Sequence, residues 1–268
     1  MTTLRFALNH MAVPRRDFVA FFALARELGI DAVEIRNDLD GIAISDGTAP
    51  EAVRAAAEAA GLTILSINAL QRFNDWTAAR AAEATALADY AAACGARGLV
   101  LVPVCDGTTE DRETLERALA ALKPILAERR LAGLVEPLGF TFSSLRSKAD
   151  GAAAIAAVGG EGVFRLVHDT FHHHLAGETD LFPELTGLVH ISGVADEAVP
   201  VSDMRDPHRV LVDADDRLDT VRQIAALLAG GYAGALSFEP FAPAIHGLAD
   251  PAVALRASMA FIEAGLEG

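Results

Sequence analysis

Short apolar runs alternate along the chain with longer segments in which apolar residues recur at helical spacing. The short runs are rich in leucine and β-branched residues and are bounded by turn residues, a pattern typical of β-strands. The expected strands are Arg5–Asn9, Ala32–Ile35, Thr63–Asn68, Gly98–Val102, Gly133–Glu136, Phe164–His168, Leu188–Ser192 and Ala235–Glu239. The expected helices are Arg15–Leu28, Pro50–Ala60, Asp75–Cys94, Asp111–Arg129, Lys148–Val158, Leu181–Leu185, Asp216–Ala229 and Pro251–Ala264.

Several of these strands are apolar on both faces, as GLVLV and LVHIS illustrate. Parallel strands have this pattern when helices cover one side of the sheet and packed side chains fill the other. Strand and helix alternate throughout the 268 residues, which predicts a single (β/α)8 barrel over residues 1–268. A doubly wound open sheet is the alternative. It is disfavoured because the first strand continues as FALNHMAVPRR, without a glycine-rich phosphate loop.

Composition limits the partners and the compartment. The chain has 22 Lys+Arg and 37 Asp+Glu, a net charge of −15, and a field of this sign repels nucleic acid and anionic membrane surfaces. We therefore expect neither as a partner. Cys94 and Cys105 lack the paired spacing of a zinc or redox site, and the N-terminal residues lack the apolar core of a signal peptide. Free thiols in a reducing cytoplasm are expected.

Candidate chemistry gathers at the carboxyl ends of the later strands, the side of a barrel that carries active sites. Glu136, Asp169, His190 and Glu239 each close an apolar strand, where an unpartnered ionisable side chain is costly to bury. Three carboxylates and one imidazole suit one divalent ion, and Mn²⁺, Co²⁺, Mg²⁺ and Zn²⁺ are all compatible. In the alternative interpretation, the two glutamates pair with arginines at the rim and Asp169 bonds to His190.

Two absences narrow the reaction. Lys123 and Lys148 are the only lysines, and both lie in or beside expected helices, so a Schiff-base aldolase has no evident nucleophile. The loops after the last two strands begin SGVADEAV and EPFAPAI and share one glycine. Phosphosugar barrels usually bind phosphate with glycine-rich loops there, so an unphosphorylated substrate is favoured. The polar stretch Ala195–Asp216 is expected to be a long loop forming an active-site wall.

The fragments FALNH, VEIR, INAL, LVEPLGF, VHDTFHHH, VHISGV, DPHRV and LSFEPF resemble the sugar isomerase and epimerase family with the xylose-isomerase-type barrel. Within it, they most resemble the inosose (2-keto-myo-inositol) isomerases of inositol catabolism. The match runs from the first strand to the last. The resemblance implies that one divalent metal is held by Glu136, Asp169, His190 and Glu239. It also implies that the two glutamates flank the substrate and exchange its protons.

The resemblance further implies that His172, from the Asp-x-x-His segment, and Arg209 contact the sugar. Where the family continues after this arginine with Pro-Gly-x-Gly, the present chain has Val212-Asp213-Ala214-Asp215. This departure predicts a loop shaped for a different substrate.

Early strand ends supply further candidates. Asn9, Glu34, Arg36 and Asn68 match family segments, and we expect them to hydrogen-bond the substrate or the groups surrounding the metal. Alternatively, Glu34 and Arg36 form an ion pair at the rim.

Phe73 and Trp76 follow the third strand. They are candidates for an apolar wall beside a sugar ring, or for ordinary loop packing.

The leading hypothesis is a metal-dependent isomerase or epimerase of an unphosphorylated ketose or keto-inositol (inosose). Its two glutamates, Glu136 and Glu239, would move a proton through an enediolate. One alternative is a keto-inositol dehydratase on the same metal site, and another is a non-catalytic sugar-binding barrel. An abasic-site endonuclease is disfavoured by the acidic charge and the single ligand set. The alanine-rich segment Asp75–Cys94 is compatible with a homo-oligomer interface, or simply with high helix propensity.

Overall fold

The computed structural model describes residues 4–109 and 111–267. Its strands form a closed barrel in which neighbours in the sequence pair in parallel, and the last strand pairs with the first. The strands are β1 Phe6–Asn9, β2 Ala32–Arg36, β3 Thr63–Gln71, β4 Gly98–Val102, β5 Ala132–Val135, β6 Phe164–Asp169, β7 Thr186–Ile191 and β8 Leu236–Phe238. The predicted (β/α)8 barrel is confirmed, and every expected strand is found with small shifts at its ends.

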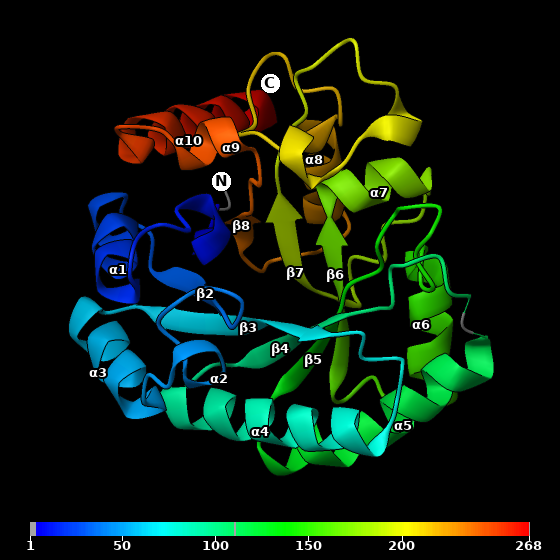
Figure 1. Cartoon of the computed structure of the whole chain (residues 1–268). Coiled ribbons are helices and arrows are strands. Elements are labelled where there is room, and N and C mark those ends of the chain that lie inside the picture. The colour runs from blue at the N-terminus through cyan, green and yellow to red at the C-terminus, as the bar shows by residue number, and fades with distance from the viewer. Residues whose placement is uncertain (1–3, 110, 268) are drawn as a thin grey trace.

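Helices surround the barrel (Figure 1). They are α1 Phe18–Glu27, α2 Ala43–Asp46, α3 Pro50–Ala60, α4 Ala78–Cys94, α5 Arg112–Glu128, α6 Lys148–Ala157, α7 Thr170–Ala176, α8 Thr220–Ala229, α9 Pro243–His246 and α10 Pro251–Glu267. Short 3₁₀ helices lie in the connecting loops, namely η1 His10–Ala12, η2 Val201–Asp203 and η3 Asp206–His208. Within the described ranges, no helix is both long and apolar enough to cross a membrane.

One expected helix is wrong. Residues Leu181–Leu185 form no helix, and the helix after β6 is instead α7. The Asp169 carboxylate starts α7 by accepting hydrogen bonds from the backbone N–H groups of Phe171 (2.8 Å) and His172 (3.1 Å), as an N-cap residue does. Phe182, inside the expected helix, has a φ of 53°, outside the right-handed helical region.

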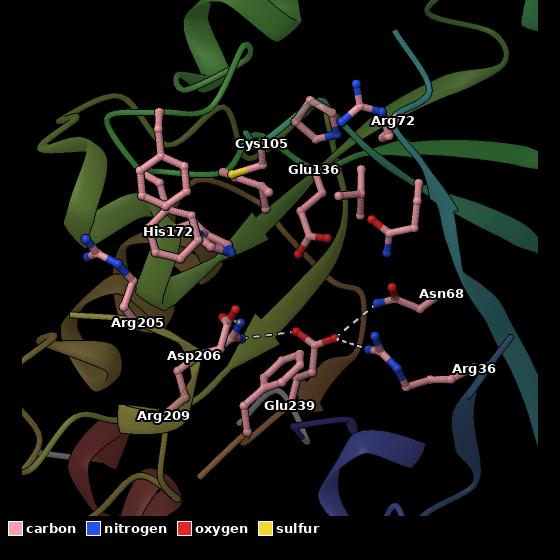
Figure 2. A pocket seen from close by; sticks show the side chains of 17 residues that line it. Arg36, Asn68, Arg72, Cys105, Glu136, His172, Arg205, Asp206, Arg209 and Glu239 are labelled. Carbon is pink, nitrogen blue, oxygen red and sulfur yellow. Dashed lines mark hydrogen bonds and ion pairs between the residues drawn. The ribbon is translucent and has the colours of Figure 1, made fainter. Parts of the chain in front are cut away.

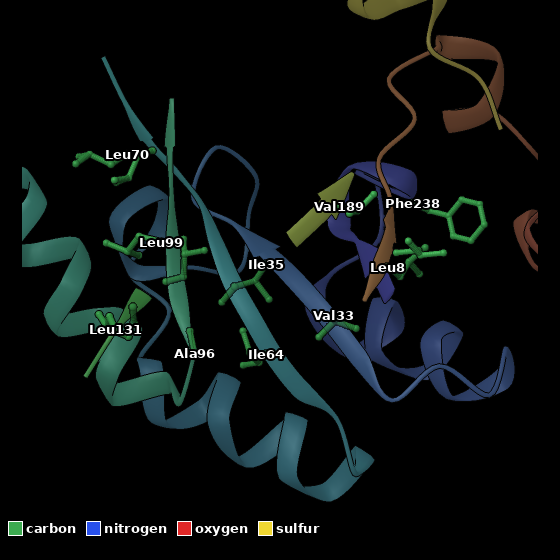
Figure 3. Close-up of a cluster of buried hydrophobic side chains, with 14 of the residues drawn as sticks. Leu8, Val33, Ile35, Ile64, Leu70, Ala96, Leu99, Leu131, Val189 and Phe238 are labelled. Carbon is green, nitrogen blue, oxygen red and sulfur yellow. The ribbon is translucent and has the colours of Figure 1, made fainter. Parts of the chain in front are cut away.

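Side chains along the strands alternate between two environments. Leu8, Val33, Ile35 and Phe238 face the surrounding helices and are buried in the main hydrophobic cluster (Figure 3). The next residue in each case, such as Asn9 after Leu8, points into the barrel. Deeper in the barrel, the inward positions are apolar and form a second buried cluster that includes Val100, Leu134, Val167 and Leu188. Polar groups are therefore concentrated at the carboxyl ends of the strands.

Gly139, in the loop after β5, allows that loop to approach α7. A Cβ atom at this position would collide with the backbone oxygen of His172 and would lie 2.8 Å from the backbone nitrogen of Ala176. Backbone atoms of a packed helix cannot move aside cheaply. The absence of a side chain at Gly139 therefore fixes how this loop packs beside the mouth of the barrel.

Gly139→Ala should destabilise the fold by about 1–3 kcal/mol, the usual cost of overpacking. Gly162→Ala is the matched control because a Cβ there meets no atom within 4 Å, and its effect should stay within about 0.5 kcal/mol. Urea unfolding of the two variants and the parent measures both values. Equal stabilities of the two variants would contradict the close-approach argument.

Candidate metal and substrate site

The four ionisable residues predicted at the later strand ends meet at the mouth of the barrel. Glu136 directly follows β5, Asp169 ends β6, His190 lies in β7 and Glu239 directly follows β8. All four are buried, and one ligand atom from each lies within 4.8 Å of those of the others. Asp169 and His190 are also direct partners in the register of β6 and β7. The barrel thus gathers a compact oxygen and nitrogen donor set.

The imidazole of His190 has a defined orientation. Its Nδ1 atom lies 2.8 Å from Glu136 Oε1 and 3.3 Å from Glu239 Oε2. Its Nε2 atom lies on the opposite side of the ring, 3.1 Å from Glu34 Oε1. With Nε2–H donating to Glu34, Nδ1 faces the other carboxylates. Without a metal, Nδ1 carries a proton that it donates to Glu136, and a bound divalent ion would take the place of that proton. Metal-binding histidines are commonly held in this way by a carboxylate behind the ring.

Glu34 lies below the mouth rather than in the substrate space. Its carboxylate is fully buried and accepts hydrogen bonds from the hydroxyls of Ser66 (2.6 Å) and Ser237. Burial alone would raise the pKa of Glu34, but His190 and the two hydroxyls hold this pKa at about 2. The buried Asn9 side chain bridges Glu34 and Glu239. Asn9 and Glu34 were expected to bond either the substrate or the groups surrounding the metal. Both lie around the donor set, and neither lines the cavity.

Two buried arginines balance the acidic cluster. Arg209 Nη2 lies 2.6 Å from Asp169 Oδ2 and 3.1 Å from Glu239 Oε2. Arg36 Nη1 lies 2.9 Å from Glu239 Oε1, and its other nitrogens bind Asp38. Arg36 therefore forms no rim pair with Glu34. The alternative interpretation pairs both glutamates with arginines and Asp169 with His190. Only the pairing of Glu239 is found: Glu136 bonds to His190, and Asp169 bonds to Arg209 and lies 3.9 Å from His190 Nδ1.

Burial and charge act in opposite directions on the cluster. Burial and the nearby Glu136 raise the pKa of Glu239 to about 7, although His190 and Arg209 oppose the shift. Burial would also raise the pKa of Asp169, but Arg209 and neighbouring histidines lower it to about 2. Burial would lower the pKa of His190, whereas Glu239, Glu34 and Glu136 raise it well above its ordinary value. Crowded carboxylates therefore favour positive charge at this point.

These observations fit a divalent ion. The donor set is compact and buried, its imidazole nitrogen faces its carboxylates, and carboxylate repulsion favours a cation among them. Among the described residues, no second group of three or more such donors is found.

A cavity of about 430 Å³ lies above the donor set, within the range of small-molecule sites. Figure 2 shows Glu136, Glu239, Asn68 and Arg36 converging on it. Asn68 Nδ2 donates to Glu239 Oε1 at 3.0 Å. His172 and Arg209, expected from the resemblance to contact the sugar, also line this space.

His172 is held against an aromatic wall. Its ring meets Phe140 and Phe171 edge to face, with centroids 5.0 and 5.2 Å away. Burial lowers the pKa of His172, which favours the neutral imidazole. Its Nδ1 atom is buried without a hydrogen-bond partner among the described residues.

The aromatic wall was not predicted. Phe140 and Phe142 stack at 5.0 Å, and the Arg205 guanidinium covers both rings. The proposed wall residues Phe73 and Trp76 do not line the cavity; Phe73 is fully buried, so ordinary packing is the correct interpretation. Phe140 and Phe142 lie in the loop that follows β5 and Glu136, and this position could have identified them as cavity residues.

The long loop after β7 forms a wall, as predicted: it contributes Arg205, Asp206 and Arg209. Residues 212–215, where the sequence departs from the Pro-Gly-x-Gly of the family, do not line the cavity, and Val212 is buried in the main core. The following Asp216 carboxylate holds the turn by accepting from three backbone N–H groups, those of Val194, Leu218 and Thr220. Residues 212–215 therefore make no direct contact with the cavity through which they could shape it for a different substrate in the way that the sequence predicted. The remaining unpredicted lining residues are Gln71, Arg72, Val102, Pro103, Cys105, Leu138 and Phe241.

Glu34→Gln should weaken Zn²⁺ and Mn²⁺ binding roughly 10- to 100-fold, since it removes the charge behind the His190 ring. Glu51→Gln, at an exposed position in the first turn of α3, is the control and should bind as the parent does. Calorimetric titration of the metal-free proteins measures both. Parent-like affinity in Glu34→Gln would contradict this role.

Comparison with known proteins agrees with the fold. The model of the xylose isomerase-like TIM barrel family matches residues 22–264. A xylose isomerase domain containing protein from Salmonella typhimurium LT2 is 33% identical, with a TM-score of 0.90 over 98% of this chain and 97% of that chain. None of the curated proteins matches the chain.

More distant structures share the barrel. The IOLI protein, whose crystal structure holds a zinc atom, is 18% identical, with a TM-score of 0.84 over 98% of both chains. An L-ribulose 3-epimerase is 20% identical, with a TM-score of 0.74 over 99% of this chain and 95% of that chain. The family match and the 33% identical structure together show that this chain belongs to the xylose isomerase-like TIM barrel family.

Proposed function

We propose that this chain is a divalent-metal-dependent isomerase or epimerase of an unphosphorylated ketose or keto-inositol (inosose). The observation that carries the proposal is the pair of buried glutamates, Glu136 and Glu239, which share one donor set and line one cavity. A metal held by Glu136, Asp169, His190 and Glu239 would act as a Lewis acid on adjacent carbonyl and hydroxyl oxygens of the sugar. The zinc in the IOLI structure and the epimerase activity in the name of the other barrel support this assignment.

The two glutamates differ in their surroundings. Oε1 of Glu136 faces His190, and Oε2 has no hydrogen-bond partner among the described residues. Both oxygens of Glu239 accept hydrogen bonds, from Asn9, Arg36 and Asn68 on Oε1 and from Arg209 on Oε2. We assign the first proton abstraction to Glu136, because its free oxygen has a lone pair available.

The proton leaves the carbon that bears a hydroxyl beside the ketone, and an enediolate remains. Glu239, which lines the same cavity, returns a proton. Return to the neighbouring carbon moves the carbonyl, while return to the opposite face of the first carbon inverts it. His172 and Arg209 line the same cavity and would donate hydrogen bonds to substrate oxygens as negative charge develops.

The substrate class follows from the lining. Polar groups line the cavity together with Phe140, Phe142 and Phe241, whose rings give it an apolar part beside the guanidinium groups that lie over them. The loops after β7 and β8 have the single glycine Gly193 near their starts, so they offer no glycine-rich phosphate cradle. We place the enzyme in the cytoplasm, where the free thiols of Cys94 and Cys105 would stay reduced.

Glu136→Gln and Glu239→Gln should each lower kcat by roughly 10²–10⁴-fold, the usual contribution of general acid–base catalysis. Glutamine has the same shape, so the barrel should still form, although Glu239→Gln removes the charge that Arg36 and Arg209 pair with and should lower the stability. The assay uses the metal-loaded protein with 2-keto-myo-inositol and free ketoses, and NMR identifies the product. Exposed Glu51→Gln is again the control.

The result that supports the proposal is an isomeric product whose formation needs both glutamates. Loss of one water from the substrate would instead identify a dehydratase. Parent-like turnover in both glutamine variants would remove the glutamates from the mechanism.

A further inference from the structure

Lys148 is a buried cation outside the donor set. It begins α6 and is only 3% exposed. Its Nζ atom lies 2.8 Å from His168 Nδ1 and 3.5 Å from the backbone oxygen of Leu181, and no carboxylate among the described residues pairs with it. Burial lowers the pKa of Lys148 to about 8. A lysine buried without an ion-pair partner is costly, so its position calls for a physical reason.

The neighbours of Lys148 form a row of hydrogen bonds with one consistent direction. A protonated lysine only donates, so His168 Nδ1 accepts and the Nε2–H of His168 donates to Gln223 Oε1 at 2.9 Å. The Gln223 amide then donates to the backbone oxygen of Thr170, at the start of α7, at 3.1 Å. Lys148 is therefore connected to the helix that carries His172.

A small cavity lies beside Lys148. Its volume is about 10 Å³, and it is lined by Pro137, Arg146, Lys148, Val167, Asp169, His172, His173 and Glu178. Arg146, Asp169 and Glu178 already have hydrogen-bond partners. The Nδ1 atoms of His172 and His173 are both buried, and neither has a hydrogen-bond partner among the described residues. A polar cavity of this size is at the threshold for holding one water molecule. The two histidines that carry these unpartnered nitrogens, together with Lys148, thus line a space that one water fits.

We propose that one internal water occupies this cavity and that Lys148, acting through it, keeps the proton of His172 on Nε2. Water has two hydrogens and two lone pairs. Its oxygen accepts from Lys148 Nζ, and its two hydrogens go to Nδ1 of His172 and Nδ1 of His173. Both Nδ1 atoms then act as acceptors, which places the ring proton of each neutral histidine on Nε2.

This arrangement gives His172 a defined role at the substrate cavity. The ring lines that cavity, and an Nε2–H presents a hydrogen-bond donor to a substrate oxygen. Lys148 is in this sense a positioning residue, since it acts only through the water and His172. The catalytic consequence rests on the proposed function, whereas the water and the tautomer do not.

The tautomer is measurable without a substrate. Long-range ¹⁵N–¹H spectra of protein labelled at its 8 histidines distinguish Nε2–H from Nδ1–H, and His172→Gln assigns the signal of that residue. The parent should show His172 as Nε2–H, and a crystal structure of the parent should show one water beside Lys148. An Nδ1–H tautomer, or a cavity without a water, overturns the proposal.

Lys148→Met keeps the length of the side chain and removes its donor. It should convert His172 to a mixture of tautomers. Lys123→Met is the matched control, because within the described part of the chain Lys123 Nζ donates only to the backbone oxygens of Val158 and Gly159. The His172 spectrum should not change in this variant. An unchanged spectrum in Lys148→Met overturns the proposal. The parent measurements stand even if this variant folds poorly.

Once a substrate is known, Lys148→Met should lower kcat/KM roughly 10-fold, as loss of a supporting hydrogen bond does, with metal content unchanged. Failure of the proposed function gives no turnover with any ketose, yet it leaves the parent's water and tautomer in place. Failure of the present inference gives the wrong tautomer in a protein that still turns over its substrate. The two failures are therefore distinguishable.

Discussion

Charge balance at the mouth of the barrel is the constraint on which the site depends. Glu136, Asp169, Glu239 and Glu34 are all buried there, and close carboxylates in a low dielectric repel one another strongly. The structure places His190 between them and adds Arg209 and Arg36 as fixed cations. The imidazole faces the carboxylates with Nδ1, so a divalent ion at this point would relieve the repulsion and would displace the Nδ1 proton to use that nitrogen as a ligand.

The fold makes this arrangement possible because the two sides of each strand face different surroundings. Outward residues such as Val33 and Phe238 hold the helices, which leaves inward positions at the strand ends for polar groups. Asp169 contacts both α7 and the charged cluster. One of its oxygens caps α7 and thereby positions His172, while the other bonds to Arg209. A single carboxylate therefore connects the donor set with the substrate cavity.

The sequence contains enough information for the barrel and the donor set because both follow from local pattern. Strand periodicity places Glu136, Asp169, His190 and Glu239 at strand ends, and parallel pairing brings those ends together. Depth below the mouth does not follow from this pattern. Glu34 and Arg36 lie two positions apart on β2, yet only Arg36 lines the cavity.

Loops and tertiary packing account for the remaining differences. Phe140 and Phe142 form the wall that Phe73 and Trp76 were expected to supply, because loop conformation decides which ring reaches the cavity. Lys148 was correctly expected beside a helix, but its burial against His168 arises from contacts between distant segments. The most direct test of the metal-dependent proposal is elemental analysis of purified protein, joined to a screen of inososes and free ketoses with and without chelator. We expect one divalent ion per chain and activity that chelation removes and added metal restores; protein without stoichiometric metal, and without metal-restored activity, would contradict the account.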